Sequence, residues 1–212
     1  MGKMTPALLP LFPLHLVAFP RTRVPLHIFE ERYKEMIGEA VANSTEFGIV
    51  LAQNEGILQV GCSMSVDKVI NRYEDGRMDI IAVGVRRFEI EQLDQEKEYL
   101  RATVSFFDDD EQQETPPDVQ FQALQQYKRW LELDEPRPFG DALLEDPQLS
   151  FQLAHSISDQ PFRQSILQIR SEVERLKKVT SFLSESATKL RETARIRKAA
   201  PMNGHSSHLP NL

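Results

Sequence analysis

The chain has 212 residues, 41% of them hydrophobic and 27% charged, which is the composition of an ordinary soluble globular protein. Its length allows one large domain or two small ones, each with a hydrophobic core. The net charge of -7 argues against nucleic-acid binding as a general role, because proteins with that role carry an excess of Lys and Arg to neutralise phosphates.

Cysteine usage and hydropathy predict a cytoplasmic protein that does not contact a membrane. The single cysteine, Cys62, excludes an intrachain disulfide framework and a cysteine-based zinc site. Pro10 and Pro13 interrupt the apolar start of the chain, so we expect no signal peptide. No apolar run approaches the roughly 20 residues that span a bilayer.

The first distinctive stretch, Leu9–Tyr33, contains four prolines and two histidines and ends in Phe-Glu-Glu-Arg-Tyr. It could be an active-site loop that holds acids and bases on a rigid frame, or it could be structural. His15 and His27 lack further ligands at the spacing of a metal site. Glu30 and Glu31 are adjacent, so on a helix their side chains point about 100° apart and do not converge. We therefore interpret the stretch as structural.

An amphipathic helix is predicted at the end of this stretch. Apolar residues recur there with a period near 3.6, at Phe29, Tyr33, Met36, Ile37, Ala40 and Val41. We expect the rings of Phe29 and Tyr33 to stack on the buried face of its first turns. We also expect Glu30 to form an ion pair with Lys34, which follows one turn later.

Three further strands complete a β-rich lobe that we predict at residues 1–107. The first strand has alternating apolar residues, namely Val60, Cys62, Met64 and Val66. Asp75-Gly76 predicts a two-residue type I′ hairpin, after which the return strand is apolar on both faces at residues 80–83. The third strand has one apolar face, formed by Leu100, Ala102, Val104 and Phe106. Gly61 and Gly84 lie within or beside these strands and indicate bulges or sharp bends.

Residues 108–118 form an acidic segment without apolar side chains, which we interpret as a linker between two lobes. Thr115 is the predicted N-cap of the following helix, and Pro116 is predicted at its first position. A helical lobe is then predicted at residues 119–198 and a flexible tail at residues 199–212.

The last helix of the helical lobe is predicted to be long. It opens with a capping box, in which Glu174 follows Ser171 by three residues. Its inner positions have heptad spacing, namely Val173, Leu176, Thr180, Leu183, Ala187, Leu190 and Ala194. A basic cluster near its end contains Lys189, Arg191, Arg195, Arg197 and Lys198. Favourable interaction with the helix dipole explains part of this cluster, and contact with an acidic partner or with RNA is the alternative.

No catalytic or nucleotide-binding motif is present. The chain lacks a Gly-x-x-x-x-Gly-Lys-[Ser/Thr] phosphate loop, a Gly-x-Gly-x-x-Gly helix start and a Gly-x-Ser-x-Gly elbow. Cys62 lies on the apolar side of a predicted strand, so we expect it to pack in the core. The sequence therefore predicts no catalytic residue, no cofactor and no metal ion.

An ordered set of motifs resembles the N-terminal substrate-binding domain of Lon proteases. The set comprises LPLFPL, PLHIFEERY, FGIV, VGCSMSVDKV, the Asp75-Gly76 turn and GVRRFEI. The likeness covers residues 8–107, and the remainder to about residue 197 resembles the α-helical half of the same module. It implies an α+β fold, in which a small PUA-like β-barrel with one inserted helix precedes an α-helical bundle with a long last helix.

The resemblance also marks family positions, which we expect to be structural. It implies that four prolines frame edge strands and turns, where no ladder N–H is needed: Pro10, Pro13, Pro20 and Pro25. The other family positions are Phe29, Glu30, Arg32, Tyr33, Gly61, Gly84, Arg87 and Phe88. We account for them physically by aromatic burial and one ion pair.

Lon proteases continue into an ATPase module and a Ser-Lys protease module, whereas this sequence ends before them, so the resemblance is to the stand-alone form of the domain. It implies a non-enzymatic module that binds polypeptide segments or a partner protein, as an adaptor or regulator in protein quality control and proteolysis. We expect an apolar groove between barrel and helices to be the binding site. The alternative is an RNA-binding protein, because PUA-like barrels often serve that role.

Overall fold

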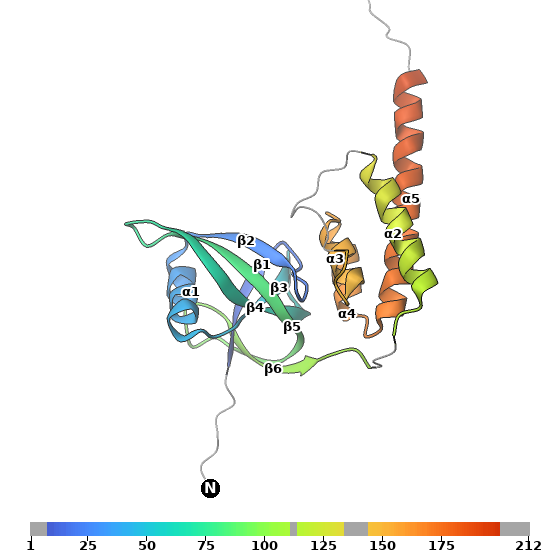
Figure 1. The fold of residues 1–212 in the computed structure, drawn as a ribbon. Helices are drawn as coiled ribbons and strands as arrows, with labels where there is room; N and C mark the ends of the chain where they lie inside the picture. The colour runs from blue at the N-terminus through green and yellow to red at the C-terminus, as the bar shows by residue number, and fades with distance from the viewer. Residues whose placement is uncertain (1–7, 111–113, 134–143, 200–212) are drawn as a thin grey trace, which may run out of the picture.

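The computed structural model describes residues 8–110, 114–133 and 144–199, with side chains as far as residue 192. Figure 1 shows a β-rich lobe that includes helix α1, beside a lobe that contains the other helices. The elements are β1 (Leu9–Leu14), β2 (Arg23–Ile28), α1 (Glu31–Asn43), β3 (Phe47–Gln53), β4 (Gly56–Arg72), β5 (Met78–Asp94), β6 (Arg101–Phe107), α2 (Pro117–Leu131), α3 (Leu149–His155), α4 (Gln160–Gln168) and α5 (Glu172–Ala199).

The strands form one sheet in the order β2-β5-β4-β3-β1-β6, and β6 also pairs with β5. Strands β5, β4, β3, β1 and β6 therefore close into a ring, while β2 lies outside the ring against β5. The predicted α+β fold is confirmed, although the sheet is not a clean barrel because β2 does not take part in the closure.

The positions of the prolines in the sheet differ from the expectation. Pro25 lies in the outer strand β2, but Pro10 and Pro13 lie in β1, between β3 and β6, so an edge position is wrong for these two. The ladder between β1 and β6 is short and involves Leu9 and Pro10 of β1. Pro13 lies beyond that ladder. Every β6 carbonyl of the ladder therefore keeps its partner although Pro13 has no N–H.

Strand β3 is buried on both faces. Alternate residues point into the main core, which β3 shares with α1 and with the helical lobe, whereas Val50 joins a smaller cluster on the opposite face. Phe88 belongs to the smaller cluster, and a Cβ added to Gly48 or Gly61 would lie 2.7 or 2.6 Å from its ring. At Gly61 the carbonyl oxygen of Ile49 is equally close, at 2.6 Å, and the ladder of β3 with β4 shifts register beside it, so the close approach and the local irregularity both favour glycine.

Helix α1 buries Tyr33 against Phe12, with ring centroids 4.3 Å apart. The predicted burial of Phe29 is wrong, because Phe29 precedes the helix and its side chain is 59% exposed. Strand β2 runs as far as Ile28 and buries every second residue, so the same alternation places Phe29 outside.

The ion pairs in the first turn of α1 also differ from the prediction. Glu30 pairs with Arg32, and Lys34 pairs with Glu31. Glu30 lies before the helix in extended conformation, with φ -75 and ψ 137, so it lacks the geometry of an i, i+4 pair with Lys34.

The β4–β5 hairpin is where the sequence places it, but its turn is not of type I′. In the described loop Tyr73–Arg77, Gly76 has a positive φ of 83, whereas Asp75 does not. The N–H of Gly76 donates to the carbonyl of Tyr73, and the N–H of Tyr73 donates to that of Arg77. This is a three-residue loop with a glycine bulge, and the Asp75 carboxylate supports it by accepting the Arg77 N–H.

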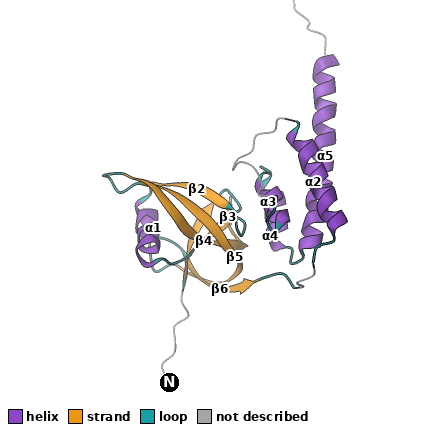
Figure 2. Ribbon diagram, in the orientation of Figure 1, coloured by secondary structure: helices purple, strands orange, loops and turns teal. Residues whose placement is uncertain are grey.

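In the helical lobe, α3 and α4 lie between the β-rich lobe and the pair α2 and α5 (Figure 2). Helix α2 begins at Pro117 with Pro116 as N-cap, so the predicted cap at Thr115 is wrong by one residue. One half of the predicted capping box forms, because the N–H of Glu174 donates to Ser171 Oγ at 3.4 Å. Among the described residues, no helix is both long and apolar enough to cross a membrane.

Candidate functional site

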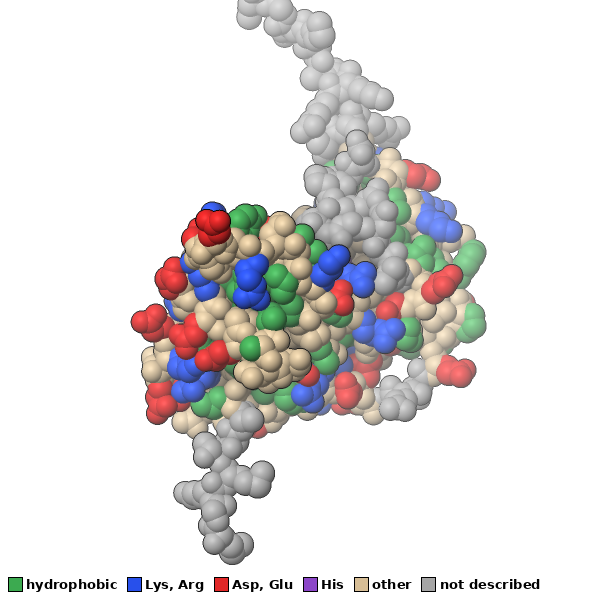
Figure 3. Space-filling model, turned by 60° about the vertical axis from the view of Figure 1, so that its left-hand side comes forward, with side chains coloured by type: hydrophobic (Ala, Val, Ile, Leu, Met, Phe, Trp, Pro, Cys, Tyr) green, Lys and Arg blue, Asp and Glu red, His purple; other side chains and the backbone are tan. Residues whose placement is uncertain are grey.

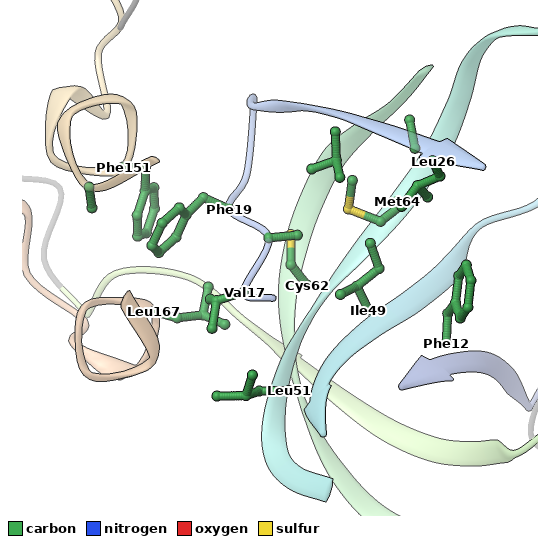
Figure 4. Packing of buried hydrophobic residues seen from close by; sticks show 14 of the residues in the cluster. Phe12, Val17, Phe19, Leu26, Ile49, Leu51, Cys62, Met64, Phe151 and Leu167 are labelled. Carbon is green, nitrogen blue, oxygen red and sulfur yellow. The ribbon is translucent and has the colours of Figure 1, made fainter. Parts of the chain in front are cut away.

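The proline-framed stretch connects the two lobes. After β1 the chain enters the helical lobe, and Val17 and Phe19 are buried there. Phe19 stacks on Phe151 of α3 with ring centroids 5.3 Å apart, and Figure 4 shows Val17 beside Leu167 of α4. A Cβ on Gly84 would lie 1.9 Å from the carbonyl oxygen of Phe19, so this close approach requires glycine.

Buried arginines surround this contact. Arg163 of α4 is fully buried and donates to the carbonyl oxygens of Val17, His155 and Ile157, which ties the proline-framed stretch to the helices. It also donates to Nδ1 of His155. A ring nitrogen that accepts a hydrogen bond carries no proton, and the His155 ring is therefore neutral. Burial and the neighbouring Arg163 charge lower the pKa of His155 to about 3.

A second group of buried side chains centres on Asp109. Arg87 of β5 donates to its Oδ1 at 2.7 Å, and Arg175 of α5 binds both carboxylate oxygens. Burial alone would raise the pKa of Asp109, but the hydrogen bonds and charges of Arg175 and Arg87 outweigh it and hold that pKa below its usual range. Asp109 comes from the segment in which we expected a linker, and through Arg87 and Arg175 it connects β5 to α5. The expected groove between the lobes stays a prediction.

The residues considered for chemistry do not converge. His15 contacts the carbonyl of Ala52, whereas His27 pairs with Asp79. Cys62 is buried, and burial raises the pKa of its thiol, which disfavours a reactive thiolate. In the described part of the chain, no group of three or more His, Cys, Asp or Glu side chains could hold a metal ion.

The opposite end of the β-rich lobe exposes large apolar side chains. Phe29, Ile70 and Tyr73 are 59%, 48% and 39% exposed, and they lie where β2, β4 and the β4–β5 turn end together. We name this region the hairpin-end surface and define it as His27, Phe29, Ile70, Asn71, Tyr73 and Asp79. The β4–β5 hairpin projects away from the helical lobe in Figure 1. Figure 3 shows the β-rich lobe from another side, where hydrophobic side chains also lie exposed among charged ones.

One carboxylate organises the hairpin-end surface. Asp79 accepts hydrogen bonds from Asn71 Nδ2 at 2.9 Å, from His27 Nδ1 at 2.6 Å and from the Tyr73 hydroxyl at 2.7 Å. These donors hold the pKa of Asp79 well below its ordinary value. The ring of His27 stacks on Phe29 at 5.9 Å and meets Tyr73 edge-on at 6.2 Å. The result is an exposed aromatic surface in which His27 and Tyr73 donate to one carboxylate and Phe29 stacks on His27.

Comparison with known families identifies the domain. Residues 8–185 match the family described as the ATP-dependent protease La (LON) substrate-binding domain. The chain belongs to this family. The confirmed resemblance extends through the helical lobe to residue 185 and therefore includes both the junction and the hairpin-end surface.

Relatives of the Lon family support the same fold. The chain is 29% identical to the Lon protease of Syntrophus aciditrophicus (strain SB) in an alignment 111 residues long, which covers 47% of this chain and 14% of that protease. The structure resembles a Lon N-terminal domain protein from Xanthomonas campestris, with TM-score 0.66, 24% identity, and coverage of 82% of this chain and 98% of the other. It also resembles the N-terminal domain of a Mycobacterium avium complex Lon protease, with TM-score 0.59, 16% identity, and coverage of 84% and 98%.

The Lon motif positions lie at the junction, in the β-rich core, at the start of α1 and at the hairpin-end surface. Arg87 and Gly84 belong to the junction, and Phe88 fills the smaller core cluster. Arg32 pairs with Glu30 and lies 4.6 Å from the ring centroid of Tyr33. Phe29 belongs to the hairpin-end surface instead of the core.

The predicted basic cluster lies on the last turns of α5. Lys189 and Arg191 are exposed there. Arg195, Arg197 and Lys198 lie in the same helix, but their side chains fall outside the described part of the chain. A role for this cluster in partner contact remains a prediction.

Sequence reasoning missed several of the residues that organise these regions. Asp109 looked like part of a solvated acidic run, and Asp79 looked like one polar residue in an apolar strand. Arg163 and Arg175 gave a weak signal, because each lies among the apolar positions of its helix. Their partners are distant in the sequence, so no local pattern could reveal them.

Proposed function

We propose that this Lon-family domain captures segments of unfolded polypeptide on the hairpin-end surface and has no catalytic activity of its own. The observation that carries the proposal is the group of exposed aromatic side chains around Asp79. An exposed apolar group held in fixed orientation is typical of a protein-binding site, because aromatic anchors contribute most of the energy at such sites. Substrate binding by the Lon family supports a polypeptide as the ligand.

The sheet edges at this end favour side-chain contact over strand addition. Pro25 lies in β2, on the outer side of the sheet, where a proline weakens any added ladder. The pairing of β3 with β4 ends at Met64, and β4 then shifts register between Val66 and Lys68 and again between Val69 and Asn71. Such irregularities twist an edge away from further pairing. A bound segment would therefore contact the ring surfaces of the hairpin end.

The cellular role follows from this binding activity. A domain that holds unfolded segments without cutting them acts as an adaptor or regulator in protein quality control, and we place that role in the cytoplasm. Its partners are then unfolded polypeptides and a protease that acts on them. The acidic segment 108–118 joins the two lobes, and we propose that it fixes them relative to each other through Asp109.

Fluorescence anisotropy with a labelled, unstructured peptide rich in Phe and Leu tests the proposal. We expect Phe29→Ala to weaken binding about fivefold or more, as truncation of an interface anchor does. Phe121→Ala is the matched control, because Phe121 of α2 is 60% exposed but lies on the other lobe. Equal affinities of the wild type and the Phe29→Ala variant would refute the site.

A further inference from the structure

Asp79 occupies a central place in the hairpin-end surface. It lies in β5, paired in register with His27 of β2 on one side and with Asn71 of β4 on the other. Tyr73 approaches from the hairpin turn. One carboxylate thus binds side chains from two neighbouring strands and from the loop that joins β4 to β5.

This hydrogen-bond network does not hold the strands together. β5 already pairs with β2 and with β4 by backbone ladders that continue on both sides of Asp79, with local register shifts in β4, and exposed ion pairs add little to stability. The network does fix side chains. Exposed aromatic and polar side chains otherwise sample several rotamers, and a ligand that immobilises them binds more weakly as a result.

We infer that Asp79 is a positioning residue for polypeptide capture, which orients His27 and Tyr73 so that, with Phe29, they present one preformed aromatic surface to the ligand. The inference rests on the function proposed above. In this inference the ligand contacts Phe29 and the neighbouring rings, whereas Asp79 orients those rings without contacting the ligand.

The chemistry of the donors explains why a carboxylate is needed. An ionised carboxylate only accepts hydrogen bonds, so the proton lies on Nδ1 of His27 and the hydroxyl of Tyr73 points at Asp79. An amide at position 79 offers one acceptor oxygen and an NH₂ group that faces other donors. Asn71 and Tyr73 donate to one oxygen of Asp79, and His27 donates to the other. Asp79→Asn therefore conserves size and shape but must reverse the bond to His27, with the amide NH₂ donating to Nδ1, and it removes the charge that strengthens all three hydrogen bonds.

The test measures peptide affinity, ring orientation and stability of the full chain. With the labelled Phe- and Leu-rich peptide, we expect Asp79→Asn to weaken binding about fivefold, with a melting temperature within about 2 °C of the wild type. The nitrogen chemical shifts of the His27 ring should change from the Nδ1–H tautomer toward the Nε2–H tautomer, in which Nδ1 accepts from the amide. Asp67→Asn is the control, because Asp67 lies on the same strand as Asn71 and pairs with Arg23 at 3.5 Å. It should leave affinity and the His27 shifts unchanged.

Two outcomes separate this inference from the proposed function. If Phe29→Ala weakens binding while Asp79→Asn changes the His27 tautomer without changing affinity, the positioning role is overturned and the site remains. If Phe29→Ala leaves affinity unchanged, the site itself is wrong.

Should Asp79→Asn fail to fold, Tyr73→Phe decides, because it keeps the ring and removes one donor. We then expect a loss of about twofold to threefold, and unchanged affinity overturns the inference.

Discussion

The lobe junction and the hairpin end each contain a carboxylate that accepts hydrogen bonds from several elements. At the junction the donors to Asp109 are Arg87 and Arg175, with side chains 2% and 0% exposed, whereas at the hairpin end His27 is 47% exposed. If the carboxylate is lost, water cannot replace its hydrogen bonds to the buried guanidinium groups, whereas water can replace the hydrogen bond to an exposed imidazole. The same bonding pattern therefore stabilises the fold at one end and orients side chains at the other.

Two phenylalanines show the same contrast. Phe19 is fully buried and stacks on a ring of the helical lobe, so it joins two parts of the fold. Phe29 is exposed and stacks on His27, which is itself exposed. A substitution at the junction should change stability, and one at the hairpin end should change binding.

The largest effect is expected when the junction loses its carboxylate. Asp109→Ala leaves Arg87 buried without its carboxylate partner and leaves Arg175 with Glu172 alone, and we expect it to lower the free energy of unfolding by about 3–5 kcal/mol. Asp110→Ala is the control, because that residue is 68% exposed and pairs with Arg170 at 3.4 Å, and it should cost less than about 1 kcal/mol. Urea unfolding of both variants measures the difference. Similar losses for the two would show that Asp109 has no special place in the junction.

A slightly smaller effect is expected from a single added methyl group. Gly84→Ala places a Cβ against the backbone of Phe19 and strains the hydrogen bonds of Gly84 with Arg21 and Thr22, so we expect a loss of about 3 kcal/mol. In Gly38→Ala, no described atom lies within 4 Å of the new Cβ, and the residue is inside helix α1. That variant should be more stable by about 0.5–1 kcal/mol. Thermal unfolding measures both variants. If their melting temperatures shifted from that of the wild type in the same direction and by the same amount, this account would be contradicted.

The junction should also make stability depend on pH through His155. Its pKa is about 3 in the folded chain, mainly because of burial, and about 6.5 when unfolded. Between these values the unfolded chain binds a proton that the folded chain does not, so stability falls as pH falls below about 6.5, by about 1.4 kcal/mol per pH unit. We expect a loss of about 2 kcal/mol at pH 5.

Urea unfolding from pH 7 to 5 measures this dependence. His155→Gln is the matched variant, because an amide oxygen can accept from Arg163 but does not titrate in this range. Between pH 7 and pH 5, the free energy of unfolding of this variant should fall by about 2 kcal/mol less than that of the wild type, which is the amount attributed to His155. An unchanged slope would mean that carboxylates alone cause the acid sensitivity.

Local sequence patterns predicted the elements well, because each reports on a single helix or strand. A period of 3.6 located α1 and the burial of Tyr33, and Asp75-Gly76 located the hairpin. The error at Phe29 arose because one residue fits both the helix period and the alternation of the preceding strand. Only the end of β2 at Ile28 decides between them.

The candidate site could not be predicted in the same way. Asp79 and His27 are 52 residues apart, and Asp109 and Arg175 are 66 apart, so each pair forms only when the chain has folded. The burial of Arg163 is equally non-local, since its acceptor, the carbonyl of Val17, lies 146 residues away in the sequence. A single sequence contains no signal that links such positions, whereas it does contain the periodicity of a helix.

The smallest effect on stability is expected at the hairpin end. Phe29→Ala removes a ring that is 59% exposed, so we expect the free energy of unfolding to change by less than about 0.5 kcal/mol. Phe19→Ala, measured beside it, should lose about 3–5 kcal/mol because it opens a cavity against Phe151. If Phe29→Ala destabilises the chain as strongly as Phe19→Ala, then the ring of Phe29 is covered in solution. The hairpin end would then be a second structural contact, and peptide capture would need another surface.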